Sequence, residues 1–198
     1  MTNEPSQRPA ISNNLRNAVV IAVTTVLIIG AVLLVKQPWK QTATAGVSSV
    51  SISLPPGQVA PAVGVAASDF TATTITGQTV TLSGLRGTPV WLLFGATWCQ
   101  NCRVESPDVQ ALSQQYAGRV QVVGVYVQED AATVTGYAQR MGLTYPQIAD
   151  TQDAIAASYA VDGIPAHVFI GADGIIKKIA VGTLAKADAQ SVLESLLG

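Results

Sequence analysis

After residue 63, short apolar runs alternate with segments whose hydrophobic positions recur at helical spacing. The run at 90–94 contains no polar residue, which is typical of a strand buried on both faces of a sheet. The order strand–helix–strand, helix, β-hairpin, helix predicts an α/β fold with a mixed sheet and helices on both faces. The predicted strands are 79–82, 90–94, 120–127, 168–170 and 175–181, and the predicted helices are 99–116, 131–141, 151–159 and 186–197.

One much longer uncharged run covers residues 18–35. At 1.5 Å per residue it would span about 27 Å, close to the thickness of a hydrocarbon core. The small residues at 43–45 resemble a cleavage site, but the run is longer than an export signal usually has. We therefore predict an uncleaved, single-pass transmembrane anchor in the cell membrane. The short polar tail, 1–17, is expected inside, with the following domain on the extracytoplasmic side.

The composition changes again over residues 36–62, where Ser, Thr, Ala, Gly, Val and Pro dominate. Such a segment is typical of a flexible, semi-extended linker. The alternating residues 50–54 are compatible with a short strand that Pro55 and Pro56 would end. The predicted organisation is thus tail, anchor, linker and one globular domain at 63–198.

Composition and charge exclude several classes of protein. The chain has 198 residues, of which 48% are hydrophobic and 12% charged, so it is not a disordered polyelectrolyte. The net charge is −1, with 11 basic and 12 acidic residues, which gives no basic surplus for nucleic acid. Two cysteines and one histidine exclude a disulfide-rich scaffold, and a four-ligand zinc site would need carboxylates.

The strongest chemical signal is the Cys-x-x-Cys motif formed by Cys99 and Cys102, which follows a buried strand and opens a helix. Cysteines three residues apart at a helix start lie close enough to form a disulfide. Free backbone N–H groups and the helix dipole would favour the Cys99 thiolate, which predicts that Cys99 attacks. Cys102, one turn further, would be buried and resolve the mixed disulfide. Trp98 would cover the site with an apolar surface.

Three other interpretations of the two cysteines are weaker. A c-type haem site requires histidine after the second cysteine, where Arg103 stands. A zinc ribbon requires a second cysteine pair, which is absent from the sequence. A purely structural disulfide would close a very small loop and contribute little stability.

Three further residues and one peptide bond are candidates for the site, each with an ordinary structural alternative. Glu105 lies three residues after Cys102 and is either a proton carrier for the buried thiol or a solvated helix carboxylate. His167 is more simply explained as a strand residue than as a ligand. Arg103 either adds positive potential or is solvated, and the Ile164–Pro165 bond is either cis or an ordinary trans turn.

Several motifs in order resemble the membrane-tethered, thioredoxin-fold thiol–disulfide oxidoreductases of the TlpA/ResA type, within the redoxin (AhpC-TSA) group. The resemblance implies a thioredoxin fold with an added N-terminal β-hairpin, a cis Pro165 facing the disulfide, and a role for Glu105 in proton handling. Trp98, Ile164 and Pro165 are then the candidate client-binding residues. Asn101 departs from the family, which often has proline there. The matching segments are 68–70, 77–87, 94–99, 102–107 and 163–165.

The resemblance also implies a function. Many such proteins reduce disulfides in apocytochrome c during haem attachment, with electrons from a membrane thiol carrier. We therefore expect an extracytoplasmic enzyme that reduces protein disulfides through Cys99 and Cys102, without a cofactor beyond that redox-active pair.

Two alternatives use the same fold. In a Cu(I) metallochaperone, Cys99, Cys102 and His167 would form a soft ligand set. A thiol peroxidase would need threonine three residues before its reactive cysteine, whereas Thr97 lies two before Cys99.

Overall fold

The computed structural model describes residues 17–18, 20–27, 50–53 and 60–198. The chain divides into two units, Met1–Thr44 and Ala45–Gly198, and the second carries the sheets described below. Residues 17–18 and 20–27 are helical, and within the described part of the chain no helix has the length and apolar character needed to cross a bilayer. The rest of the predicted anchor, 28–35 with residue 19, lies outside the described residues, as do 1–16 and most of the predicted linker.

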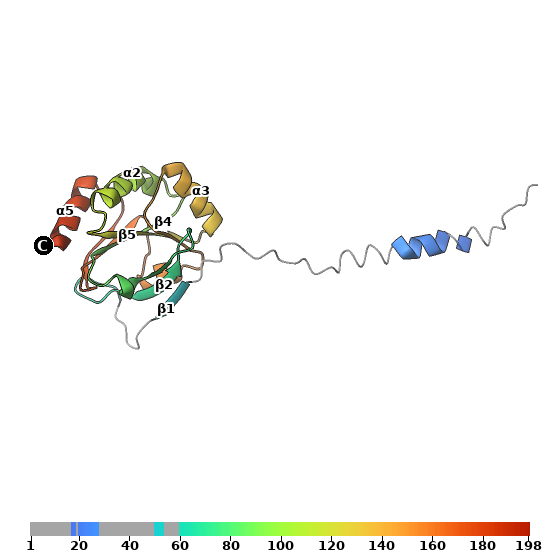
Figure 1. The fold of residues 1–198 in the computed structure, drawn as a ribbon, viewed down its shortest axis with the longest axis horizontal. Helices are drawn as coiled ribbons and strands as arrows, with labels where there is room; N and C mark the ends of the chain where they lie inside the picture. The colour runs from blue at the N-terminus through green and yellow to red at the C-terminus, as the bar shows by residue number, and fades with distance from the viewer. Residues whose placement is uncertain (1–16, 19, 28–49, 54–59) are drawn as a thin grey trace, which may run out of the picture. The chain divides into compact units, whose positions relative to one another are not determined.

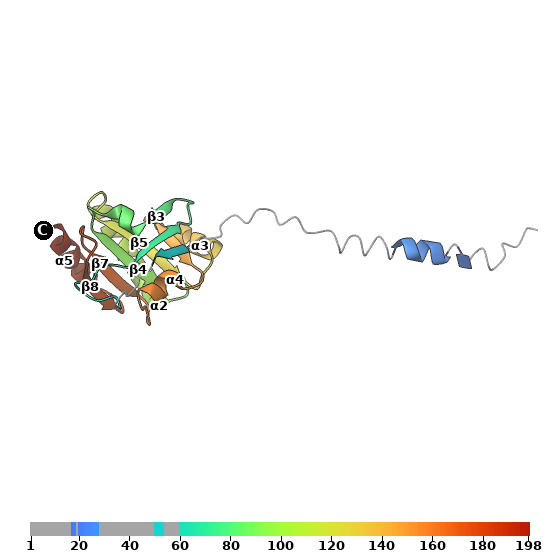
Figure 2. The ribbon, with the colours of Figure 1, turned by 90° about the horizontal axis from the view of Figure 1, so that it is seen from below.

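A five-stranded mixed sheet forms the centre of the second unit, in the order β6-β5-β4-β7-β8 (Figures 1 and 2). Strand β4 runs parallel to β5 and antiparallel to β7, β5 is parallel to β6, and β7 and β8 form an antiparallel hairpin. The strands are β4 (Val90–Gly95), β5 (Gln121–Val127), β6 (Gln147–Asp150), β7 (Ala166–Ile170) and β8 (Ile176–Val181).

A second, antiparallel sheet of three strands precedes the central one, in the order β1-β2-β3. It consists of β1 (Val50–Ser53), β2 (Asp69–Thr73) and β3 (Thr79–Thr81), and the 3-10 helix η1 (Leu82–Leu85) follows. The hairpin β2–β3 agrees with the N-terminal extension that the family resemblance implied. Strand β1 is the short strand expected before Pro55, and it pairs with β2, so the folded unit includes residues N-terminal to 63.

Apolar side chains on the two faces of the central sheet form two cores. Trp91 and Leu93 of β4 face the core under α2 (Gln100–Gln115), α3 (Ala131–Met141) and α5 (Lys186–Leu197). The alternate residues Val90, Leu92 and Phe94 face the core shared with α4 (Ala154–Ser158) and the N-terminal sheet. Figure 1 shows α2, α3 and α5 on one side of β4 and β5, and β1 and β2 on the other. The predicted strand at 90–94 with two buried faces is confirmed, because its alternate side chains pack into the cores on opposite faces of the sheet.

Two strands were missed and one predicted helix is shorter than expected. Strand β6 has polar residues at both ends, although all four of its residues are buried, so its sequence does not look like a buried strand. Strand β2 is short and was not predicted either. The helix expected at 151–159 is only Ala154–Ser158, because Asp153 has a positive φ of 55° and interrupts the helical backbone.

Candidate active site

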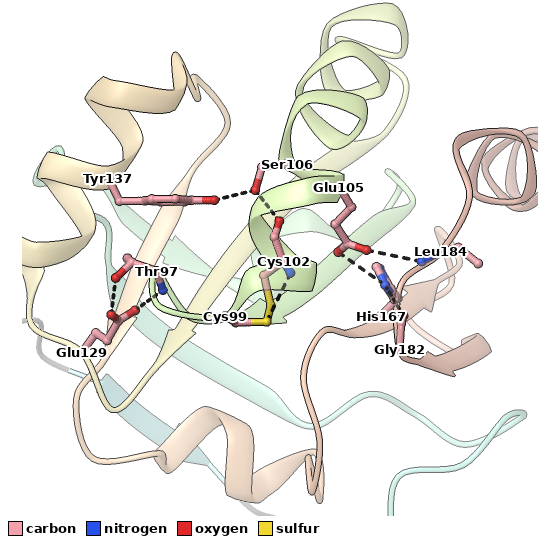
Figure 3. Close-up of a disulfide and its surroundings, with 10 residues drawn as sticks. All are labelled: Thr97, Cys99, Cys102, Glu105, Ser106, Glu129, Tyr137, His167, Gly182 and Leu184. Atoms are coloured by element: carbon pink, nitrogen blue, oxygen red, sulfur yellow. Dashed lines mark hydrogen bonds and ion pairs between the residues drawn. A yellow bond between two sulfur atoms is a disulfide. The ribbon is translucent and has the colours of Figure 1, made fainter.

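The two cysteines lie where β4 ends and α2 begins, and they form a disulfide with a Cα–Cα distance of 5.3 Å (Figure 3). Cys99 is the N-cap of α2, and its sulfur accepts a hydrogen bond from the backbone N–H of Cys102 at 3.2 Å. The sulfur therefore occupies the position where a helix offers free donors and the positive end of its dipole. This geometry stabilises a thiolate on Cys99 once the disulfide is opened.

Both cysteines are well shielded, each 7% exposed. They form a small apolar cluster with Ala96, against which Val127 and Ile164 pack. Exposure therefore does not distinguish an attacking from a resolving cysteine, and the N-cap position of Cys99 is the feature that does. The backbone of Gly95 comes close to Cys102, since a Cβ placed on this glycine would lie 3.3 Å from the Cys102 sulfur.

The bond between Ile164 and Pro165 is a cis peptide, and Pro165 is buried. Trp98 is 69% exposed, so it is a surface side chain beside the disulfide. Trp98 and Ile164 line a groove of about 330 Å³ that continues over β5 and α4, with Asp153 and Asp162 in its wall. The site thus has an apolar, accessible flank next to the sulfurs.

Glu105 is buried on α2, one turn after Cys102, with 4% of its surface exposed. Figure 3 shows its carboxylate directed toward Leu184 and His167, while Cys102 is directed toward Cys99. The backbone N–H of Leu184 donates to Oε2 at 3.3 Å. Burial raises the pKa of Glu105 from 4.5 to about 7, and the Leu184 hydrogen bond only partly opposes that rise. The solvated-carboxylate interpretation of Glu105 is therefore wrong, because the side chain is buried against His167 and the backbone of Leu184.

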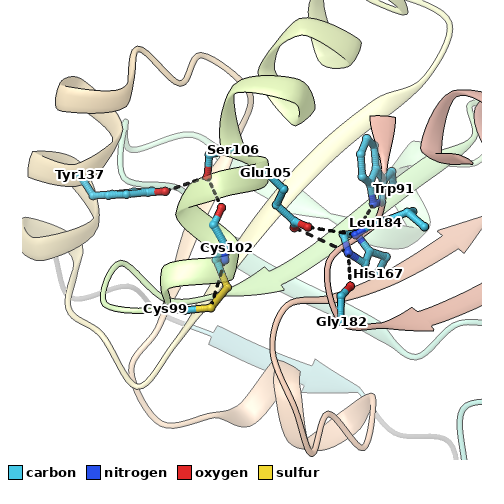
Figure 4. Close-up of polar contacts among 9 residues, drawn as sticks. All are labelled: Trp91, Cys99, Cys102, Glu105, Ser106, Tyr137, His167, Gly182 and Leu184. Atoms are coloured by element: carbon cyan, nitrogen blue, oxygen red, sulfur yellow. Dashed lines mark hydrogen bonds and ion pairs between the residues drawn. A yellow bond between two sulfur atoms is a disulfide. The ribbon is translucent and has the colours of Figure 1, made fainter. Parts of the chain in front are cut away.

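His167 is fully buried in β7, beside Glu105 (Figure 4). Its Nδ1 accepts a hydrogen bond from the Trp91 indole N–H at 3.3 Å, and its Nε2 lies 3.2 Å from the carbonyl oxygen of Gly182. Nε2 also lies 3.6 Å from Oε1 of Glu105. Burial lowers the pKa of His167 to about 4, so the ring is neutral and the approach to Glu105 is not an ion pair.

The chain is similar to known redox proteins over most of this unit. The AhpC/TSA family model matches residues 63–179. The chain belongs to the AhpC/TSA family. It is 37% identical over 140 residues to the thiol-disulfide oxidoreductase ResA of Geobacillus kaustophilus, covering 70% of this chain and 80% of ResA. It is 31% identical over 150 residues to the thioredoxin-like protein YneN of Bacillus subtilis, covering 74% of this chain and 84% of YneN.

Solved structures agree with this membership. The thiol:disulfide interchange protein of Chlorobium tepidum superimposes with a TM-score of 0.63 at 29% identity, covering 70% of this chain and all of the other. The DsbF structure from MTB has a TM-score of 0.60 at 26% identity, covering 64% of this chain and 94% of DsbF. The AhpC/TSA domain of this chain therefore has a thioredoxin-like fold, and the chain is a thiol–disulfide oxidoreductase of the ResA type.

In this AhpC/TSA domain, Glu129 is a site residue that the sequence analysis missed. It follows β5, is 8% exposed, and accepts hydrogen bonds from both the backbone N–H (2.7 Å) and the hydroxyl of Thr97. Because β4 and β5 are parallel, their carboxyl ends meet at one edge, and this placement was the signal available in the sequence. Glu129 thereby fixes the segment that leads into Cys99.

Ser106 and Tyr137 support the same helix from its other side. The Ser106 hydroxyl donates to the Cys102 carbonyl at 2.7 Å and also contacts the Tyr137 hydroxyl at 2.7 Å. Arg103 is exposed, and its charge lowers the pKa of Tyr137 against the larger, raising effect of burial. These contacts anchor the first turns of α2, which carry both cysteines.

The geometry does not favour the two alternatives on this fold. Both ring nitrogens of His167 are occupied by contacts within the protein, so a copper site shared with the cysteines lacks its third ligand. Among the described residues, no three His, Cys, Asp or Glu side chains are grouped as a metal site would require. For a peroxidase, the Thr97 hydroxyl is engaged by Glu129 rather than directed at Cys99.

Proposed function

We propose that this protein reduces disulfides of client proteins on the extracytoplasmic side of the cell membrane, where residues 18–35 hold it. Apocytochrome c, with its pair of closely spaced cysteines, is the proposed client class. The uncharged run at 18–35 and the resemblance to ResA-type proteins support this placement. Electrons would come from a dithiol carrier in the membrane, and we propose no cofactor beyond the Cys99–Cys102 pair.

The reaction begins with the reduced enzyme. The Cys99 thiolate attacks one sulfur of the client disulfide, forming a mixed disulfide and releasing the other client sulfur as a thiolate that takes up a proton. The Cys102 thiolate then attacks the Cys99 sulfur, which releases the second client sulfur as a thiolate that also takes up a proton. The client has gained two electrons and two protons, and the enzyme is left with the Cys99–Cys102 disulfide for the carrier to reduce.

One observation carries the assignment of the attacking residue. The sulfur of Cys99 caps α2 and accepts the N–H of Cys102, a hydrogen bond that favours the charged form of the sulfur. Cys102 occupies the third position inside the helix, one turn from the cap, and lacks the cap geometry. Cys99 is therefore the nucleophile, and Cys102 is the resolving cysteine.

Glu105 is the proposed proton carrier for Cys102. Residues three apart on a helix have Cβ atoms about 5–6 Å apart, so the side chains of Glu105 and Cys102 start from neighbouring points of α2. Rotation of the carboxyl group would then bring it to the thiol once the disulfide opens. The carboxylate takes the proton of the Cys102 thiol, giving a thiolate and a neutral carboxyl group. A pKa of about 7 for Glu105 suits both the acceptance and the return of this proton near neutral pH.

The same carboxyl group bears on the direction of electron flow. A buried carboxylate beside the cysteines disfavours their thiolates, and a destabilised thiolate favours the disulfide over the dithiol. An enzyme that favours its own disulfide is a reductant. We therefore propose that Glu105 contributes to a low reduction potential.

The client is proposed to lie against the apolar flank of the site. Trp98 offers an exposed aromatic face, Ile164 packs beside the sulfurs, and Pro165 presents the cis peptide bond. Such a surface would bind an extended segment around a client cysteine and bring its sulfur to Cys99.

Two measurements on the full-length protein test the proposal. Equilibration with a dithiol buffer should give a reduction potential of about −270 mV. A value of about −120 mV would indicate an oxidant and would contradict the proposed reductant. The variant Cys102→Ser should accumulate a mixed disulfide with a client peptide through Cys99. Its matched control, Cys99→Ser, should trap no client, and unchanged exchange in that variant would disprove the mechanism.

The location is tested separately. In intact cells, a membrane-impermeant thiol reagent should label the reduced Cys99 after treatment with an external reductant. Labelling that appears only after the cells are opened would contradict the extracytoplasmic placement.

A further inference from the structure

The hydrogen bonds around His167 determine which of its nitrogens carries the proton. The indole N–H of Trp91 is a donor only, so the Nδ1 atom it contacts must be an acceptor without a proton. The single proton of the neutral ring is therefore on Nε2. This N–H points to the carbonyl of Gly182 at 3.2 Å, and protonating Nδ1 as well would set two donors against each other.

The carboxyl group of Glu105 is held at only one of its two oxygens. Oε2 accepts the Leu184 N–H at 3.3 Å, whereas Oε1 is buried without a hydrogen-bond partner. Nε2 of His167 lies 3.6 Å from Oε1, which is just beyond hydrogen-bond distance. A movement of a few tenths of an ångström would close this contact. A buried, ionised carboxylate oxygen left unpaired is costly, so ionisation of Glu105 favours that movement.

We propose that His167 is a positioning residue for Glu105: its Nε2–H binds Oε1 of the ionised carboxylate, while the Leu184 N–H binds Oε2. The N–H is shared with Gly182 when Glu105 is neutral and turns toward Oε1 when Glu105 loses its proton. His167 itself stays neutral throughout. This inference rests on the proposed role of Glu105 as the proton carrier for Cys102.

Packing within the fold orients the ring of His167. His167 lies in β7 opposite Leu93 of β4, and its ring stacks on Phe169 with an interplanar angle of 14°. Figure 4 shows Trp91, His167 and Glu105 following one another toward the helix that carries Cys102. Gly182 is in turn fixed by its N–H, which donates to the carbonyl of Pro165 at 2.8 Å. The carbonyl that competes for Nε2–H is thus anchored to the cis-proline segment.

In the part of the chain that the structure describes, tyrosine and charged side chains surround this pair. The charge of Glu105 contributes to raised pKa values of two buried tyrosines, for which burial is the larger cause. On the α5 side, Lys186 forms an exposed ion pair at 3.7 Å with Asp108, which lies one turn after Glu105 on α2. Besides Cys102, the groups concerned are Tyr137 and Tyr145, and Lys186 paired with Asp108.

Two matched substitutions separate the Nε2–H from the rest of the ring. In His167→Asn, the shorter amide can still accept the Trp91 N–H but does not reach the Nε2 position. In His167→Gln, the amide NH₂ reaches that position and keeps a donor for Oε1. His167→Leu removes both contacts and replaces His167→Asn if that variant does not fold. Both variants lack a donor at the Nε2 position and are called donor-free below.

The experiment follows Glu105 directly in the oxidised, full-length protein in detergent micelles. Carbon-13 at the glutamate side-chain carboxyls reports each titration by NMR, and Glu105→Gln identifies the resonance by its loss. The wild-type midpoint is expected near pH 7. Both donor-free variants should titrate about one pH unit higher, the effect of one lost hydrogen bond to a charged group, and His167→Gln should stay near wild type.

A donor-free variant that folds and titrates like the wild type overturns the proposal, as does a shift in His167→Gln equal to that in His167→Asn. The titration needs no client, so its result is independent of whether the enzyme exchanges disulfides. In the exchange assay, the pH profile of His167→Asn should move in the same direction as its titration. A profile that falls uniformly at every pH would indicate a structural effect only and would contradict positioning.

Discussion

Replacement of Glu105 by glutamine is expected to change how the stability of the protein depends on pH. The side chain is 4% exposed, and burial raises its pKa from 4.5 to about 7. A carboxyl group with a raised pKa binds its proton more tightly in the folded chain than in the unfolded one. Its contribution to stability is therefore complete below pH 4.5 and is lost as the pH rises through about 7. Glutamine keeps the shape but cannot ionise.

The size of the effect follows from the interval between the two pKa values. At 1.36 kcal/mol per pH unit, the interval from 4.5 to about 7 corresponds to at most about 3.4 kcal/mol. The effective dielectric constant at buried sites is higher than that of dry protein, which reduces the penalty of burying the charge, so we expect about 2–3 kcal/mol. The free energy of unfolding of Glu105→Gln, relative to wild type, should rise by this amount between pH about 4 and about 8.

His167 makes the comparison with a variant necessary. Burial lowers its pKa from 6.5 to about 4, so its contribution to stability is complete above 6.5 and is lost as the pH falls through about 4. Between pH 4.5 and 6.5 this effect opposes that of Glu105, so the two contributions largely cancel in the wild type. The difference between wild type and Glu105→Gln isolates the carboxyl group.

The assay is urea unfolding of both oxidised, full-length proteins across this pH range. Asp162→Asn, which neutralises an exposed carboxyl group, is the matched control for the loss of one negative charge. A difference for Glu105→Gln that stays constant within about 0.5 kcal/mol would refute the reasoning, since it would mean that Glu105 titrates alike in both states.

Three further substitutions test the surroundings of the disulfide. Gly95→Ala places a Cβ 3.3 Å from the Cys102 sulfur, which cannot rotate away while bonded; we expect a disulfide destabilised by about 1 kcal/mol and a potential about 20 mV more oxidising. Glu129→Gln loses one acceptor for Thr97 and should lower the free energy of unfolding by about 1–3 kcal/mol. Trp98→Ala should change stability by less than about 0.5 kcal/mol while raising the KM for a client protein.

Each substitution has its own check. An unchanged potential for Gly95→Ala would mean that the backbone adjusts to the added methyl group. For Glu129→Gln, Thr97→Val is the paired control, and a double variant no less stable than either single one would confirm that both act through one contact. Reduction of a small disulfide by Trp98→Ala should stay at the wild-type rate, and an equal loss there would place Trp98 in the chemistry instead of client binding.

Local sequence patterns predicted much of the fold. The helices Ala131–Met141 and Lys186–Leu197 have the predicted bounds, and the strand at 90–94 extends by only one residue. Periodicity and end signals act between neighbours in the chain, as when Gly142 closes its helix with a φ of 66°. Strand β6 escaped prediction because its polar ends are buried by contacts with distant segments, which no local pattern records.

The proposed redox chemistry also follows from a local pattern, because both cysteines and the helix start that is proposed to activate Cys99 lie within four consecutive residues. The environment of Glu105 was not. Its carboxylate is held by a backbone donor 79 residues away, and the histidine beside it is oriented by an indole 76 residues distant in the chain. A titration midpoint depends on which groups exclude water and offer hydrogen bonds, and chain folding alone brings those groups together. The sequence thus determined that two cysteines lie one turn apart at a helix start, and the tertiary structure decided which groups surround them and in which protonation state.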